Sequence, residues 1–153
     1  MGIFRGQGAT EYLVLLAVVL IVALVSVALL GFFPGMASDA RIAQSQSYWR
    51  GQARPFAILE SSINATAGTF VIQNVEANGP YTLTTLAVGN GTNSTLNAAF
   101  AAGETKTAYI YSATIGAYSA SAVYDLQVNI TYTTPNGVSS KQYGTKNLIG
   151  KYV

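Results

Sequence analysis

The chain has 153 residues, of which only 9% are charged, and its net charge is +2. It contains no cysteine and no histidine, which excludes a disulfide framework and a thiolate metal site and leaves out the commonest general base and the strongest nucleophile. The few basic residues are scattered, whereas nucleic-acid binding needs clustered Lys and Arg, so we expect no nucleic-acid partner.

The first six residues form a short leader, residues 1–6, in which Arg5 is the only charged side chain. An apolar run then extends from Leu13 to Leu30, with Glu11 just before it and Ser26 as its only polar residue. About 20 apolar residues in a helix cover the roughly 30 Å of a bilayer core, so this run predicts a membrane-spanning helix. An acid beside such a run is costly and by default suggests a function, which makes Glu11 the most informative residue.

The sequence Gly31–Gly35 contains Pro34 between two glycines and predicts a kink or a break in the helix. Helical spacing resumes after it, with Ile42 and Trp49 on a thin apolar stripe. We expect one long helix over residues 7–54, kinked near Pro34, rather than two helices. A helix from Gln7 to Gly51 would be roughly 65–70 Å long, which exceeds the thickness of a membrane.

After Pro55 the sequence changes to short β-rich runs separated by turn signals about every ten residues, a pattern typical of an antiparallel sandwich or barrel. We expect six to eight strands, and the alternation of apolar and polar residues is strictest at Tyr124–Tyr132. The other expected strands are Phe56–Ile63, Phe70–Val75, Tyr81–Val88, Thr107–Ser112 and Val138–Tyr143. Pro135-Asn136-Gly137 is expected to close a hairpin into the last of these. The fold class predicted is thus α+β, a long N-terminal hydrophobic helix followed by an antiparallel β-sandwich head over residues 55–153.

The six acids are dispersed and make neither a carboxylate pair nor an oxygen-ligand metal loop, so we expect no catalytic residues, no metal and no cofactor. Asp125 falls on the polar face of its strand, where a solvated residue is expected. Trp49 is expected to dock the helix onto the sheet and Arg50 and Arg54 to be solvated, although an interface patch is the alternative.

Four tripeptides match the acceptor pattern for N-glycosylation and begin at Asn64, Asn90, Asn93 and Asn129. In a chain rich in Asn, Ser and Thr, about two such matches arise by chance. Asn90 and Asn93 lie in a Gly-rich loop, and strand alternation places Asn129 on a polar face. These three are positions that a glycan can reach, and they favour an extracellular protein.

The apolar run is too long for the core of an ordinary secretory signal and no Ala-x-Ala-like site follows it. A plain single-span anchor explains the run and the basic leader, but it explains neither Glu11 nor the polar continuation of the helix. Helical self-assembly explains all of them. If the chain is cut between Gly6 and Gln7, the new ammonium group of Gln7 can pair with Glu11 of a neighbouring copy at only one axial offset.

The stretch Gly6-Gln7-Gly8-Ala9-Thr10-Glu11-Tyr12-Leu13 resembles the class III signal peptide of archaeal type IV pilins, and the segment 48–56 resembles the junction of helix and head in such pilins. The resemblance implies cleavage by a prepilin peptidase at Gly6/Gln7, storage in the cytoplasmic membrane, and assembly by a pilus ATPase and a platform protein. The product would be an extracellular homopolymer, a filament that serves adhesion. Two alternatives stay open, an archaellin subunit and a membrane-anchored β-sandwich that binds glycans through its tyrosines.

Overall fold

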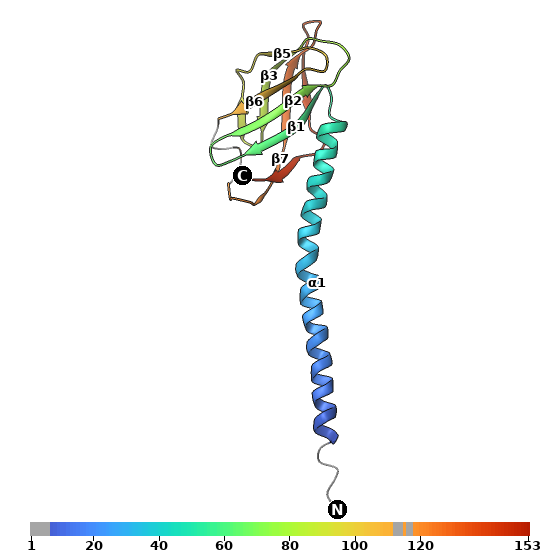
Figure 1. The fold of residues 1–153 in the computed structure, drawn as a ribbon. Coiled ribbons are helices and arrows are strands. Elements are labelled where there is room, and N and C mark those ends of the chain that lie inside the picture. The colour runs from blue at the N-terminus through green and yellow to red at the C-terminus, as the bar shows by residue number, and fades with distance from the viewer. Residues whose placement is uncertain (1–6, 112–114, 116–117) are drawn as a thin grey trace, which may run out of the picture. The chain divides into compact units, whose positions relative to one another are not determined.

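The computed structural model describes residues 7–111, 115 and 118–153, without the side chains of residues 7 and 32–34. It consists of one long helix followed by antiparallel β-sheets (Figure 1), which confirms the predicted α+β class. The chain divides into two compact units, Met1–Asp39 and Ala40–Val153, which we call the N-terminal unit and the β unit. The boundary between these units lies within the helix, so the last helical turns belong to the β unit.

Helix α1 extends from Gln7 to Gly51 without interruption. Pro34 therefore does not end it, and the expectation of one helix rather than two is confirmed. A proline inside a helix removes one backbone hydrogen bond and costs about 3 kcal/mol, a local penalty that the helical sequences on both sides can outweigh. The kink expected near Pro34 stays a prediction.

The described residues after α1 contain ten strands in three antiparallel sheets. Strands β1 (Phe56–Ile63), β2 (Gly68–Asn74) and β6 (Thr105–Ile110) form the first sheet. The second contains β3 (Tyr81–Val88), β4 (Gly91–Asn93), β5 (Ala98–Phe100), β8 (Val128–Thr133) and β9 (Ser139–Tyr143). The third pairs β7 (Val123–Leu126) with β10 (Leu148–Lys151). The antiparallel pairing was predicted, and the sandwich arrangement of the sheets stays a prediction.

Two predicted strands have the observed bounds, Phe56–Ile63 and Tyr81–Val88, and three more agree within two residues at each described end. The hairpin at Pro135-Asn136-Gly137 joins β8 to β9, and Gly137 takes a φ of +83° in its turn. The structure has more strands than the six to eight expected, because β4, β5 and β10 are only three or four residues long and carry little pattern.

The strand predicted over Tyr124–Tyr132 is wrong as one element. It is divided at Gln127, whose carbonyl accepts a hydrogen bond from Gly89 N at 2.8 Å, so that β7 pairs with β10 while β8 pairs with β3 and β9. The alternation continues across the division, because Tyr124, Val128 and Ile130 are all buried in the same core. Alternation reports which face of a strand is buried and does not report its partner strand.

One hydrophobic core joins the three sheets to the last turns of α1. Its largest fully buried side chains are Trp49, Phe56, Phe70, Phe100, Ile63, Ile72, Leu83, Leu86, Ile110 and Ile130. Strand β2 shows how the sequence builds it, since every second residue is buried and the others are half-buried. The core therefore holds the C-terminal part of α1 in place against the sheets.

Candidate functional site

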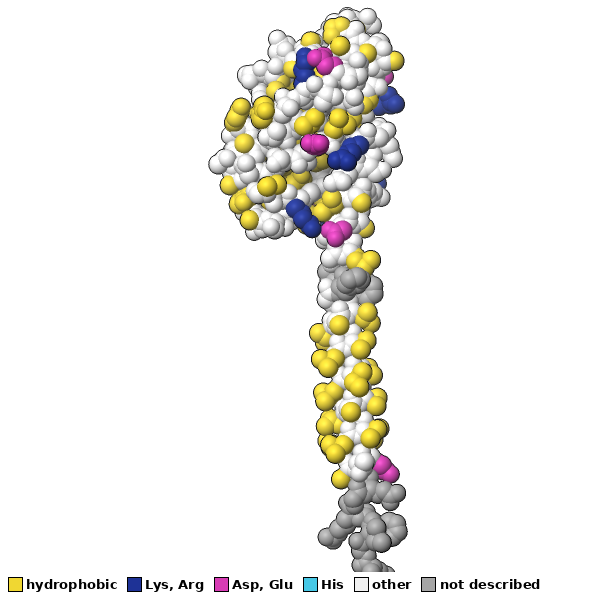
Figure 2. All heavy atoms as spheres, in the orientation of Figure 1, with side chains coloured by type: hydrophobic (Ala, Val, Ile, Leu, Met, Phe, Trp, Pro, Cys, Tyr) yellow, Lys and Arg dark blue, Asp and Glu magenta, His cyan; other side chains and the backbone are white. Residues whose placement is uncertain are grey.

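The apolar segment of α1 is uncovered in the single chain. An 18-residue window of this helix has a mean hydropathy of 3.4, and none of that window is buried. Leu24, Val27 and Leu30 are each about 70% exposed, and Figure 2 shows apolar side chains along the visible face of this part of the helix. The helix is long and apolar enough to cross a membrane. An apolar surface of this extent is not stable in water and needs lipid or other helices to cover it.

Polar groups are almost absent from this surface. The hydroxyl of Ser26 donates to the carbonyl of Val22 at 2.7 Å, so the helix satisfies its own polar residue there. Glu11 lies at the end of the apolar run, where it lines a shallow hollow with Thr10, Val14 and Leu15. Thr10 is four positions before Val14, and Glu11 is three and four positions before Val14 and Leu15, so the four residues lie on one side of the helix. A neighbour that covers this face also covers the Glu11 carboxylate.

The predicted processing and registry residues are only partly within the described structure. Gly6 lies outside the described residues, and of Gln7 only the helical backbone is described. Gln7 and Glu11 are thus one turn apart on the same helix. Their roles stay predictions.

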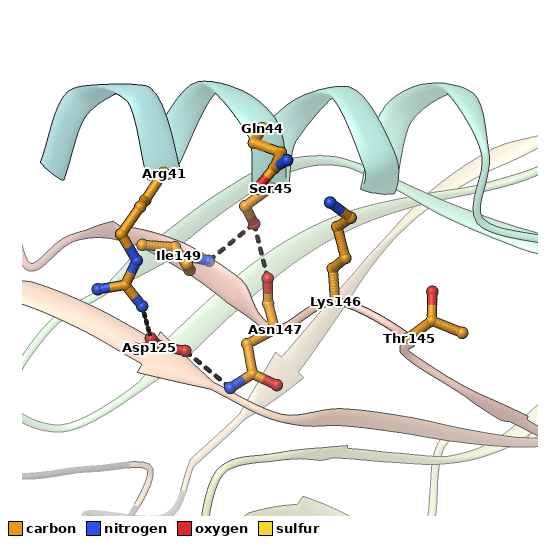
Figure 3. A pocket seen from close by; sticks show the side chains of 8 residues that line it. All are labelled: Arg41, Gln44, Ser45, Asp125, Thr145, Lys146, Asn147 and Ile149. Atoms are coloured by element: carbon orange, nitrogen blue, oxygen red, sulfur yellow. Dashed lines mark hydrogen bonds and ion pairs between the residues drawn. The ribbon is translucent and has the colours of Figure 1, made fainter. Parts of the chain in front are cut away.

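At its other end, α1 is held to the third sheet by a polar cluster formed by Arg41, Ser45, Asp125, Asn147 and Ile149 (Figure 3). Arg41 forms an ion pair with Asp125, which also accepts a hydrogen bond from Asn147 Nδ2 at 2.7 Å. Ser45 Oγ donates to the carbonyl of Asn147 at 2.8 Å and accepts from Ile149 N at 2.9 Å. We call this group the Ser45 cluster.

The spacing of residues along α1 and the register of β7 and β10 bring the Ser45 cluster together. Arg41 and Ser45 are one helical turn apart, and Asp125 and Ile149 are direct partners across β7 and β10. Ser45, which is only 2% exposed, is not among the residues predicted from the sequence, although it lies between Ile42 and Trp49 on the same helical stripe. A serine on an otherwise apolar stripe is the signal that could have identified it. Asp125 is exposed as predicted, but it is paired and not merely solvated.

The prediction for Trp49 is confirmed. Its side chain is 1% exposed and belongs to the core, where it meets Tyr48 edge-on at 5.2 Å between ring centroids. Gly144 permits this packing, because a Cβ there would lie 2.5 Å from Trp49 Cζ2. Arg50 and Arg54 are exposed. Arg50 Nε donates to the carbonyl of Leu59 at 2.7 Å, and Arg54 lies 3.4 Å from Glu76.

The four glycosylation candidates occupy different environments. Asn64 and Asn90 are exposed, whereas Asn93 and Asn129 are half-buried. Within the part of the chain that the structure describes, no group of three or more acidic, histidine or cysteine side chains is placed to hold a metal ion.

Substitutions in the Ser45 cluster test which of its contacts hold the C-terminal end of α1 to the third sheet. We expect Ser45→Ala to lower the free energy of unfolding by about 1–3 kcal/mol, because it leaves the part-buried Ile149 N–H and Asn147 carbonyl without the Ser45 hydroxyl as their partner. Arg41→Ala should cost less than about 1 kcal/mol, because the Arg41 and Asp125 side chains are 60% and 37% exposed and water screens their attraction.

Denaturant unfolding of the full-length chain in detergent measures both effects, and Ser47→Ala is the matched control, since Ser47 is exposed on the same helix. An Arg41→Ala loss larger than that of Ser45→Ala would show that the ion pair, and not the buried serine, fixes the helix end.

No protein-family model matches the sequence, and no curated protein matches it.

Proposed function

We propose that this chain is the structural subunit of an extracellular, type IV pilus-like filament. The single observation that supports this best is that one continuous helix joins an uncovered apolar segment, edged by Glu11, to turns that are anchored in a β core. Such a segment needs apolar surroundings in place of water, and both a membrane, in the stored precursor, and the core of a filament provide them.

The assembly step follows from the chemistry of the N-terminus. A prepilin peptidase removes residues 1–6 and thereby creates an ammonium group at Gln7, one helical turn from Glu11. In the filament, apolar helices from neighbouring copies cover the segment Leu13–Leu30, and each buried Leu, Ile or Val side chain is about 1.5–3 kcal/mol more stable there than it would be in water. This adhesion is strong but does not define an axial offset between subunits.

The ion pair between the Gln7 ammonium of one copy and Glu11 of the next defines that offset. A carboxylate buried among apolar helices without a partner is penalised by several kcal/mol, so only the register that pairs the two charges is favourable. Gly8 and Ala9 are small and allow the neighbouring helix to approach. The resemblance to pilins implies that an assembly ATPase and a platform protein drive extrusion of the filament. The exposed β units then mediate adhesion.

Three of the tyrosines that a glycan-binding role would need on the surface are instead part of the core. Tyr48, Tyr124 and Tyr152 are buried in the core, and burial raises the pKa of the Tyr124 hydroxyl, which lies 2.9 Å from Ser61 Oγ. Tyr109 and Tyr111 are the exposed stacked pair, with ring centroids 6.1 Å apart. An archaellin would share the same helix and differ in its secretion partners.

The surface-exposed protein should begin at Gln7. Edman or mass-spectrometric sequencing of material sheared from cells tests this, together with electron microscopy of the same sample for filaments. A chain that starts at Met1 and sediments only with membranes would support the single-span anchor instead.

A further inference from the structure

The structure distinguishes four acceptor sequences that look equivalent in the amino-acid sequence. All four end in threonine, so the tripeptides themselves give no ranking. Transfer of a saccharide needs an asparagine whose amide nitrogen is accessible and unengaged, on a loop that a transferase can surround. Each of these conditions can be checked at each site.

Asn64 fulfils them all. It opens the loop of residues 64–67 between β1 and β2, and Asn64, Ala65 and Thr66 are exposed. Its Oδ1 accepts three hydrogen bonds, from Thr66 N at 3.0 Å, Thr66 Oγ1 at 3.1 Å and Ala67 N at 2.9 Å. This is an Asx turn, which fixes the amide plane with Oδ1 toward the loop. Nδ2, on the other side of that plane, donates no hydrogen bond to any described residue.

The Asn93 side chain forms the same Asx turn, but its amide nitrogen is engaged in a hydrogen bond. Its Oδ1 accepts from Thr95 N and Thr95 Oγ1, both at 3.0 Å. Its Nδ2, however, donates to the carbonyl of Tyr109 at 2.7 Å, and the residue is half-buried. Modification of Asn93 must first break that hydrogen bond.

Asn90 and Asn129 fail for reasons of backbone conformation. The two residues after Asn90 are extended in β4 and paired with β3, and Gly91 is buried so closely that a Cβ would lie 2.7 Å from Ile115 Cγ1. Asn129 lies within β8, between β3 and β9, and its Oδ1 is buried without a partner among the described residues. A transferase cannot bend either segment around its active site without unpairing strands.

We propose that Asn64 is the N-glycosylation site of the folded chain and that its donor is a saccharide linked through phosphate to a lipid. In cells this rests on the extracellular location proposed above, because the asparagine must face the compartment of the transferase. Asn64 Nδ2 attacks C1 of the sugar, the N–C1 bond forms, and the C1–O bond breaks. The lipid phosphate leaves with the electron pair, and Nδ2 gives up one proton to a base of the transferase.

The test uses the purified full-length chain in detergent, a single-subunit oligosaccharyltransferase and a lipid-linked oligosaccharide, with glycopeptide mass spectrometry at successive times. Asn64 should be modified about fivefold faster than Asn93, the factor that corresponds to one net hydrogen bond of about 1 kcal/mol. Asn129 should remain unmodified. Thr66→Ser, which keeps the hydroxyl, should still be modified at Asn64, and Thr66→Ala should not.

Four synthetic peptides, each with one of the sequons, serve as acceptors in the same assay and should react at similar rates, since they lack the fold. The proposal is overturned if folded Asn64 is not modified while its peptide is, if Asn93 or Asn129 reacts as fast as Asn64, or if the peptides reproduce the preference for Asn64. Because this assay needs neither filament nor membrane, its failure is separate from a failure of N-terminal sequencing at Gln7.

Discussion

Glu11→Ala should abolish or severely misregister the filament while leaving the precursor in the membrane. The substitution does not shorten the apolar run Leu13–Leu30, so insertion should not change. Inside the proposed filament, however, it would remove the proposed partner of the Gln7 ammonium group. Breaking a buried ion pair on one side costs about 3–5 kcal/mol, which lowers the affinity of each subunit contact by about 10²–10⁴-fold.

Glu11→Gln separates the charge from the shape of the side chain. The amide keeps a hydrogen-bond acceptor for the ammonium group but provides no charge, so we expect a smaller loss of filament than with Glu11→Ala. Filament yield is measured by sedimentation of sheared material, and axial register by helical reconstruction from electron micrographs.

Glu60→Ala is the matched control, because Glu60 is exposed in β1 and its removal changes the net charge equally. This variant should assemble normally. Glu11→Ala filaments of normal yield and normal rise would contradict the registry role, and loss of the precursor from the membrane would show that Glu11 acts in insertion instead.

Much of the fold could be predicted because its signals are local. The apolar run determines the helix, and its polar continuation has a helical period that extends past Pro34. Strands such as β1 and β3 are long enough to carry an alternation of their own and are bounded by turn residues. These features depend on neighbours in the sequence, which a single sequence contains.

The rest depends on contacts between distant residues. Gln127 divides one alternating stretch between two sheets because its carbonyl accepts a hydrogen bond from the backbone N–H of Gly89, which lies 38 positions earlier in the chain. Ser45 is buried because its partners are Asn147 and Ile149, more than 100 positions away. The amide of Asn93 is engaged by the backbone of Tyr109, which no property of the tripeptide reveals. The pattern of apolar and polar residues does not reveal these distant hydrogen-bond partners. Such partners are the features that distinguish the candidate sites from one another.

Trp49→Ala should destabilise the β unit by about 3–5 kcal/mol, since it removes the largest side chain of the core and leaves a cavity beside Tyr48 and Gly144. In a domain of about 100 residues, this corresponds to a fall in melting temperature of more than about 10 °C. Trp49→Phe should lose far less, about 1–2 kcal/mol, because Trp49 Nε1 has no acceptor among the described residues and only ring volume is lost.

Hydrogen exchange of the β8 amides, followed by mass spectrometry on the full-length chain in detergent, reports the stability of the β unit without interference from the helix signal. Arg50→Ala, an exposed neighbour, is the control and should change exchange little. A Trp49→Phe loss equal to that of Trp49→Ala would mean that Nε1 makes an essential hydrogen bond.

Because Trp49 belongs to the β unit and the apolar segment to the N-terminal unit, Trp49→Ala should still insert and be cut before Gln7. Glu11→Ala should show the opposite behaviour, with a stable β unit and no ordered filament, so that the two variants separate folding of the subunit from its assembly.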